Sequence, residues 1–173
     1  MSGEARHRLV LWGVSTTRTL QAHWALHELC LSYECRPILP RSGETKTAEF
    51  TALNPRQKIP LLQDGKFSIA ESPAIVAYLS DTYGRKETTL IPTDARERAT
   101  WLEWCFHIMT ELDATSLYVI RRHRALRHIY GEAPVAVEGA ADYFCTQLRH
   151  AEQACRTVGI FSSGTASPRP ICC

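Results

Sequence analysis

Residues 54–79 read NPRQKIPLLQDGKFSIAESPAIVAYL, and the fold is decided in this stretch. From Pro60 to Ile69, two short apolar runs flank Asp64-Gly65, a pair that favours the tight turn of a β-hairpin. Glu71-Ser72 then precedes a helical pattern over residues 73–83, whose proline stands in the first turn, where proline is tolerated. The stretch therefore predicts strand, turn, strand and helix in direct succession.

Two more strands are expected upstream of this stretch. Residues 9–12 (LVLW) form a nearly all-apolar run, as in a strand buried on both faces, and residues 32–38 read as a second strand. Between them, apolar residues recur at helical spacing over residues 20–29, with Trp24 on the apolar face. This strand, helix and strand favour parallel pairing with a right-handed crossover. A helical turn is expected over residues 48–53.

The second half of the chain has a helical pattern. Residues 84–93 are polar and read as a linker, after which Asp94 can cap a long helix. Another long helix is expected over residues 134–155. Two helices cannot close a core alone, so they must pack on the first domain or on another subunit. Their apolar stripes are Trp101, Leu102, Cys105, Ile108, Met109 and Leu112 in the first and Tyr143, Phe144, Leu148 and Ala151 in the second.

Composition excludes several classes of protein. With 45% hydrophobic and 22% charged residues, the chain is typical of a soluble globular protein. Its net charge of +2 is too small to indicate a nucleic-acid partner, and the arginines and histidines of residues 121–128 are interpreted as a solvated helix face. No apolar run approaches the roughly 20 residues that span a bilayer. Residues 1–8 do not resemble a secretory leader, so we expect a cytoplasmic protein.

Cysteines and histidines give no sign of a disulfide framework or a metal site. The seven cysteines are odd in number and have no paired spacing. His23 and His27 have a spacing that could bind zinc, but no third ligand is near them in the sequence, and no metal is expected. We expect five cysteines to be buried as small apolar residues, namely Cys30, Cys35, Cys105, Cys145 and Cys155.

Three short motifs occur in order at the predicted strand and helix junctions. They are Trp12-Gly13 followed by Ser-Thr-Thr-Arg, residues 54–60 (NPRQKIP), and residues 71–75 (ESPAI) before Tyr78-Leu79. With these motifs in register, the chain resembles the glutathione transferases from about residue 8 to residue 155.

The resemblance implies two domains. The first is an α/β thioredoxin-like domain of order βαβ-ββα over residues 8–83, which binds glutathione. After the linker at residues 84–93 comes an all-α domain over residues 94–158, which is incomplete compared with the family.

The resemblance also implies how glutathione binds. Ile59-Pro60 is expected to be a cis peptide, and the backbone of the residue before the proline would bind the cysteine of glutathione as an added strand. Ser72 and the N–H groups of its helix would bind the γ-glutamyl carboxylate, Glu71 the ammonium, and Lys58 the glycyl carboxylate. A trans proline, a plain helix cap and a surface lysine remain the simpler alternatives. Gln57 stands where the family usually has glycine, which leaves the turn before the proline open.

The hydroxyl cluster Ser15-Thr16-Thr17 is the candidate for activating the glutathione thiol. A free thiol with a pKa of about 8.5 is mostly protonated at neutral pH. A hydroxyl that donates a hydrogen bond near a helix N-terminus lowers this pKa, and serine- and threonine-type members of the family resemble this arrangement. We favour Thr17 and then Ser15, while mere capping of the helix stays open. No Cys-x-x-Cys occurs here, so the reacting sulfur would belong to glutathione.

The second substrate would be a small hydrophobic electrophile, a peroxide or a mixed disulfide, in a pocket for which Trp104, His107 and Tyr118 are the candidates. Family members are usually homodimers. Two alternatives remain: a non-catalytic binding module, or an inactive truncated product.

The sequence changes character at residues 159–173, which show no periodicity. Codons permitted for residues 162–173, read one base earlier, give LFGDSFTAADLL, the next segment of the family with its capping box. We therefore expect a one-base frameshift between residues 155 and 159 and an aberrant tail. Loss of the following helix would expose the apolar stripes of the two long helices.

Overall fold

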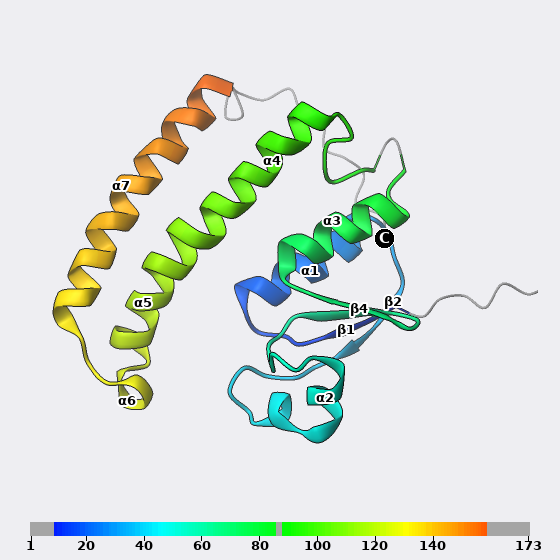
Figure 1. The fold of residues 1–173 in the computed structure, drawn as a ribbon, viewed down its shortest axis with the longest axis horizontal. Helices are drawn as coiled ribbons and strands as arrows, with labels where there is room; N and C mark the ends of the chain where they lie inside the picture. The colour runs from blue at the N-terminus through cyan, green and yellow to red at the C-terminus, as the bar shows by residue number, and fades with distance from the viewer. Residues whose placement is uncertain (1–8, 86–87, 159–173) are drawn as a thin grey trace, which may run out of the picture. The chain divides into compact units, whose positions relative to one another are not determined.

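The computed structural model describes residues 9–85 and 88–158 (Figure 1). They form two compact units, one that ends at Thr93 and one that begins at Asp94. The first unit contains a four-stranded sheet, and within its described residues the second is helical. The predicted fold, an α/β thioredoxin-like part followed by a helical part, is confirmed. The tail with the expected frameshift lies outside the described residues.

The first unit follows the predicted order of elements. These are β1 (Leu9–Trp12), α1 (Thr17–Glu28), β2 (Tyr33–Arg36), η1 (Glu44–Lys46), α2 (Ala48–Leu53), β3 (Leu61–Asp64), β4 (Phe67–Ala70) and α3 (Ser72–Tyr83). The strand order in the sheet is β2-β1-β3-β4. β1 pairs with β2 in parallel and with β3 antiparallel, and β3 and β4 form the expected hairpin. Its turn holds Gly65 at a φ of 59°, which glycine adopts without strain.

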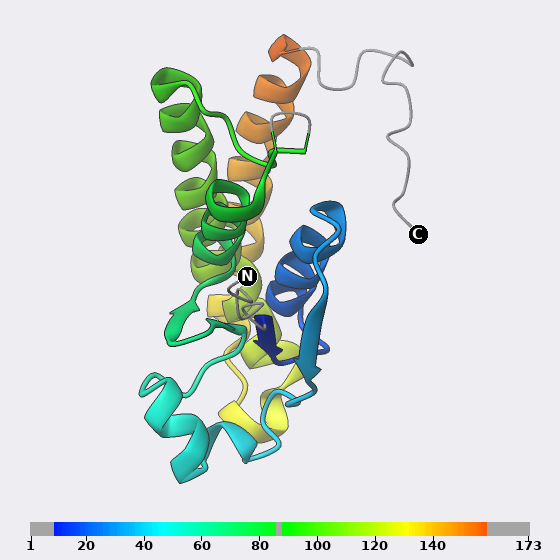
Figure 2. The same cartoon turned by 90° about the vertical axis from the view of Figure 1, so that its right-hand side faces the viewer.

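Successive side chains of β1 point to opposite faces of the sheet, so the strand contributes to a core on each face. Leu9 and Leu11 are buried in a core with α1 and α3, whereas Trp12 packs on the opposite face against Phe50 of α2. Figures 1 and 2 show α1 and α3 on one face of the sheet and α2 on the other. Because β1 is covered on both faces, its run of apolar residues is explained.

The buried face of α1 differs in part from the predicted one. Leu20 and Trp24 were expected on the apolar face, but their side chains are 58% and 61% exposed. The other residues of the same apolar pattern, Ala22, Ala25, Leu26 and Leu29, are buried against the sheet as expected. Small side chains let the helix approach the strands, while the large ones lie on the outer side, where the Trp24 indole N–H donates to Glu28 at 2.7 Å.

The expectation of buried cysteines is wrong for most of them. Cys30, Cys35 and Cys145 are exposed, and Cys105 is half-buried. Cys30 follows the end of α1 with a φ of 53°, and Cys35 lies on β2, the edge strand. At neither position is the side chain covered by the core. The side chain of Cys155 lies outside the described part of the chain.

Residues 88–91 are more than the polar linker that the sequence predicts. The Ser80 hydroxyl accepts hydrogen bonds from the N–H groups of Leu90 and Ile91, at 2.9 and 3.3 Å. Ile91 is only 2% exposed. This segment is therefore packed as part of the first unit.

The second unit consists of consecutive helical segments. These are α4 (Ala95–His107), the π-helical η2 (Ile108–Leu117), α5 (Tyr118–Ile120), the π-helical η3 (Arg121–Ala125), α6 (Arg127–Tyr130) and α7 (Pro134–Val158). Asp94 caps α4 as predicted, since its carboxylate accepts from the N–H groups of Arg96 and Glu97. α7 lies beside η2 and α5 in both views, with Leu112 and Ala140 buried. Leu102 and Leu148 of the predicted stripes are 40% and 45% exposed.

A buried carboxylate connects the hairpin to α3. Asp64, only 8% exposed, accepts hydrogen bonds from the hydroxyls of Tyr78 and Tyr83, the first at 2.7 Å. Burial, and then the bonds to Asp64, raise the pKa of both phenols. The turn of the hairpin and the last turns of α3 are therefore held by charge-assisted hydrogen bonds.

We predict that Tyr83→Phe lowers the free energy of unfolding by about 1–2 kcal/mol, because a buried carboxylate loses one donor. Because the folded-state pKa of Tyr83 lies above the unfolded value of about 10, this group contributes its full stabilisation below pH 10. The contribution is lost as the pH rises from there through the folded-state pKa. The stability of the wild type should therefore fall more steeply above pH 10 than that of Tyr83→Phe. Urea unfolding at several pH values measures both effects, with the exposed Tyr130→Phe as control. Equal slopes would contradict the assignment.

Candidate functional site

Three chain junctions meet at one edge of the sheet. The strands β1, β3 and β4 are aligned there in the row Trp12, Leu61 and Ala70. Gly13 follows the first strand, Pro60 precedes the second and Glu71 follows the third. These three residues therefore form the next row, just beyond the hydrogen-bonded strands, and bring the three sequence motifs together.

Direct contacts join the three junctions. Gly13 packs so closely on Ile59 that an added Cβ would lie 2.6 Å from the Ile59 Cβ. The Ser72 hydroxyl donates to the amide oxygen of Gln21 on α1 at 2.6 Å. Arg56 forms an exposed ion pair with Glu71 at 3.8 Å. Gln21 and Arg56 are not among the site residues expected from the sequence. Of the two, only Arg56 lies within a motif, the second, that could have indicated it.

The Ile59-Pro60 peptide is cis, as the resemblance implies. The turn before it, which the sequence left open, has Gln57 at a φ of 54°. Its N–H donates to the Asn54 carbonyl at 2.9 Å, and its side-chain amide donates to the Thr51 hydroxyl at 3.1 Å. Gln57 thus adopts a conformation that glycine takes more easily, and hydrogen bonds hold it there. The side chain of Lys58, in the same turn, is exposed.

The N-terminus of α3 has no side-chain cap. Glu71 occupies the capping position with a φ of 70°, but its side chain makes no capping hydrogen bond. α1 and α4, by contrast, are capped by Thr16 and Asp94. The first N–H groups of a helix need a partner and carry a partial positive charge. The end of α3, with Ser72 at its first position, is therefore suited to a carboxylate.

The hydroxyls of Ser15, Thr16 and Thr17, at the start of α1, have different surroundings. Thr16 and Thr19 form a reciprocal capping box, in which each hydroxyl accepts from the other's backbone N–H at 3.0 Å. Ser15, with a φ of 63°, and Thr17, the first residue of the helix, are exposed. Among the described residues, no hydrogen bond engages either of these two hydroxyls. Thr16 is therefore committed to the helix, and Ser15 and Thr17 are the hydroxyls open to a ligand.

The candidates for the second-substrate pocket lie in the second unit. Trp104 and His107 are in edge-to-face contact, with ring centroids 5.7 Å apart. Tyr118 packs instead under the guanidinium of Arg121, 5.2 Å from its ring centroid. Among the described residues, no hydrogen bond or ring contact joins Tyr118 to the other two.

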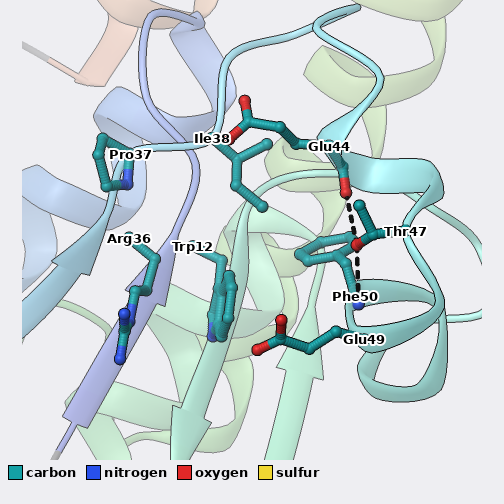
Figure 3. Close-up of a pocket in the computed structure, with 8 residues that line it drawn as sticks. All are labelled: Trp12, Arg36, Pro37, Ile38, Glu44, Thr47, Glu49 and Phe50. Atoms are coloured by element: carbon teal, nitrogen blue, oxygen red, sulfur yellow. Dashed lines mark hydrogen bonds between the residues drawn. The ribbon is translucent and has the colours of Figure 1, made fainter.

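A shallow pocket lies on the α2 side of the sheet (Figure 3). It measures about 230 Å³, and none of the predicted site residues lines it. Trp12 and Phe50 lie edge to face within it, and the guanidinium of Arg36 lies 5.7 Å from the centre of the indole. The remaining lining residues are Pro37, Ile38, Glu44, Thr47 and Glu49.

Two absences hold for residues 9–85 and 88–158. No group of three or more His, Cys, Asp or Glu side chains could hold a metal ion there. No helix in these ranges has the length and apolar character needed to cross a membrane.

Comparison with known proteins identifies the domain that carries this edge. Residues 8–81 match the family model "Glutathione S-transferase, N-terminal domain". Residues 8–81 are thus similar to the N-terminal domain of the glutathione transferases. The match covers the sheet, α1, α2 and nearly all of α3, and so includes all three junctions of the site.

Curated relatives agree with this family. A glutathione S-transferase of Silene vulgaris is 36% identical over 91 residues, which are 51% of this chain and 42% of the relative. Glutathione S-transferase F4 of Arabidopsis thaliana is 34% identical over 90 residues, 51% of this chain and 37% of the relative. The matched part of this chain thus spans about two fifths of these relatives.

Solved structures resemble the fold over more of the chain. One is a glutathione transferase homolog from Drosophila mojavensis with bound glutathione, which has a TM-score of 0.67 and 26% sequence identity. The superposed region covers 79% of this chain and 62% of the homolog. The theta class enzyme of Xanthomonas axonopodis pv. citri, also with glutathione bound, has a TM-score of 0.73 and 24% identity and covers 86% and 71%. The Xanthomonas structure, at 24% identity, shows similarity of fold alone.

We predict that Gly13→Ala is more destabilising than Gly43→Ala. Both glycines have positive φ, 108° and 91°, where alanine is strained by roughly 1–2 kcal/mol. A Cβ at Gly43 meets no atom within 4 Å, whereas a Cβ at Gly13 overlaps Ile59. Overpacking should add about 1–3 kcal/mol at Gly13 only. Urea unfolding of the two variants measures the difference, and equal losses would show that the close packing on Ile59 is unimportant.

Proposed function

We propose that this chain is a glutathione transferase, which binds glutathione at the edge formed by Gly13, Pro60 and Glu71 and activates its thiol. The observation that supports the proposal is the strand register, which brings the three sequence motifs to one row. The backbone of Ile59, next to the cis proline, would pair with the cysteine of glutathione as an added strand. The bound glutathione of the Drosophila mojavensis homolog supports this choice of ligand.

The two ends of glutathione have matching partners. The open N–H groups of α3 and the Ser72 hydroxyl, whose hydrogen would turn from Gln21 to the ligand, would bind the γ-glutamyl carboxylate, since a helix N-terminus favours an anion. Glu71 would bind the ammonium beside that carboxylate, at the cost of its exposed ion pair with Arg56. The exposed Lys58 would meet the glycyl carboxylate. These assignments place complementary charges along the length of the ligand.

The reaction would be attack by the glutathione thiolate on a small hydrophobic electrophile, or reduction of a peroxide or mixed disulfide. Thr17 or, as the second candidate, Ser15 would donate the hydrogen bond that stabilises the thiolate. Trp104, His107 and Tyr118 stay the candidates for the second substrate. The homodimer and the cytoplasmic location stay predictions drawn from the sequence.

Binding is tested with Ser72→Ala. We expect the wild type to be retained on immobilised glutathione and the variant to bind about tenfold more weakly, which corresponds to about 1.4 kcal/mol for a lost hydrogen bond to a carboxylate. Ser68→Ala, in β4, is the matched control and should bind like the wild type. Absence of retention, together with identical titrations of the wild type and Ser72→Ala, would refute the proposed site.

Activation of the thiol is tested with Thr17→Ala and Ser15→Ala. The hydroxyl that donates to the thiolate should lower kcat by roughly 10- to 100-fold when it is removed, because a donor aimed at developing charge is lost. Turnover with an aryl halide and with a hydroperoxide measures the effect. Thr16→Ala serves as the comparison, since it should lower stability by about 1 kcal/mol through the lost cap. Retention of glutathione without turnover in either assay would assign the chain to a binding module.

A further inference from the structure

His23 connects α1 to the backbone of the proposed site. Its Nε2 lies 3.1 Å from the Gly13 carbonyl oxygen, and its Nδ1 lies 2.7 Å from the Tyr33 hydroxyl. A carbonyl can only accept, so Nε2 must carry the hydrogen and donate it to Gly13. Nδ1 of the neutral ring is then an acceptor, and the Tyr33 hydroxyl donates to it. The two bonds fix the tautomer and the orientation of the imidazole.

The peptide groups around Gly13 are held from two sides. The Gly13 N–H donates to the Arg36 carbonyl at 2.8 Å, and the Val14 N–H donates to the Ile38 carbonyl at 3.0 Å. These bonds extend the pairing of β1 with the chain after β2. His23 holds the remaining polar group, the Gly13 carbonyl, from the side of the helix.

The segment from Gly13 to Ser15 contains two residues with positive φ. Gly13 has a φ of 108°, and two residues later Ser15 has a φ of 63°. A serine in the left-handed region is strained and keeps that conformation only when its surroundings impose it. The segment ends in the capping box of Thr16. His23 is thus the side chain that holds the start of the turn that presents the Ser15 and Thr17 hydroxyls.

We infer that His23 is a positioning residue for the thiol-activating hydroxyls. Through the Gly13 carbonyl it sets the orientation of the segment that carries Ser15 into α1. The inference rests on the proposed function. It also separates two properties, because His23 has no hydrogen bond to Glu71 or Ser72, the residues that would bind the γ-glutamyl end. Loss of the His23 bond to Gly13 should therefore impair ionisation of the bound thiol more than affinity for glutathione.

Two amide substitutions test each ring nitrogen separately. His23→Gln can place an N–H near the position of Nε2 and keep the donor to Gly13. His23→Asn places its amide near the position of Nδ1 and leaves the Gly13 carbonyl without that donor. Tyr33→Phe removes only the hydroxyl bond and keeps the ring, which lies between those of His23 and His27 at centroid distances of 5.6 and 6.0 Å.

The readouts are the Kd for glutathione, the pKa of the bound thiol from thiolate absorbance, and kcat. For His23→Asn we expect a thiol pKa about one unit higher and a kcat about tenfold lower near neutral pH, since one pKa unit is a factor of ten in thiolate. Its Kd should change less than about threefold, as expected when no binding group is lost. His23→Gln should restore the thiol pKa, and Tyr33→Phe should resemble the wild type.

The outcomes separate this inference from the proposed function. A wild type that ionises bound glutathione, beside a His23→Asn variant with the same thiol pKa, overturns the role of His23 alone. Equal losses of Kd and kcat in His23→Asn and His23→Gln overturn it too, because they indicate a purely structural residue. A wild type that binds no glutathione overturns both. If His23→Asn does not fold, the imidazole nitrogen shifts of the wild type decide, since an Nδ1–H tautomer contradicts the bond to Gly13.

Discussion

At the end of β1 the backbone passes Ile59 so closely that an added Cβ at Gly13 would stand 2.6 Å from the Ile59 Cβ. β1 is a central strand, paired with β2 on one side and with β3 on the other. Its close approach to the residue before the cis proline therefore sets the distance between the turn into α1 and the turn into β3. Because Gly13 has no side chain, the two turns lie close enough together for one ligand to contact both. A side chain at this position would force the turns apart.

Each of the same three junctions contains a strained backbone residue. Ser15, Gln57 and Glu71 have positive φ, at 63°, 54° and 70°, although none is glycine; among the described residues Cys30 and Arg41 share this property elsewhere. Each of the three junction residues lies in a different motif, and each motif is tied by hydrogen bonds, an ion pair or close packing to another part of the first unit. Conformations of this kind persist when their surroundings impose them, and they are common at ligand sites. The rigid sheet and its two layers of helices supply these surroundings.

The sequence predicted what depends on local chemistry. The Asp64-Gly65 turn and the Asp94 cap involve residues within a few positions of each other, and both were found. Periodicity placed α1 but not the whole of its buried face, so Trp24 was assigned to the wrong side. The hydrogen bond between Ser72 and Gln21 joins residues 51 apart in the sequence. The pattern of residues in one sequence does not predict such a long-range pair. His23 was noted only for its zinc-like spacing to His27, and its bond to Gly13 was missed, because that bond depends on how closely α1 approaches Gly13.

The uncapped end of α3 has a consequence for the protein as a whole. A helix whose first turn lacks a capping partner frays more readily, and the missing partner here would be the carboxylate of the ligand. On the proposed function, glutathione would thus complete a piece of secondary structure as well as occupy a site. A ligand that binds only the folded state raises stability with its concentration. The resistance of this chain to proteolysis would then follow the supply of glutathione around it.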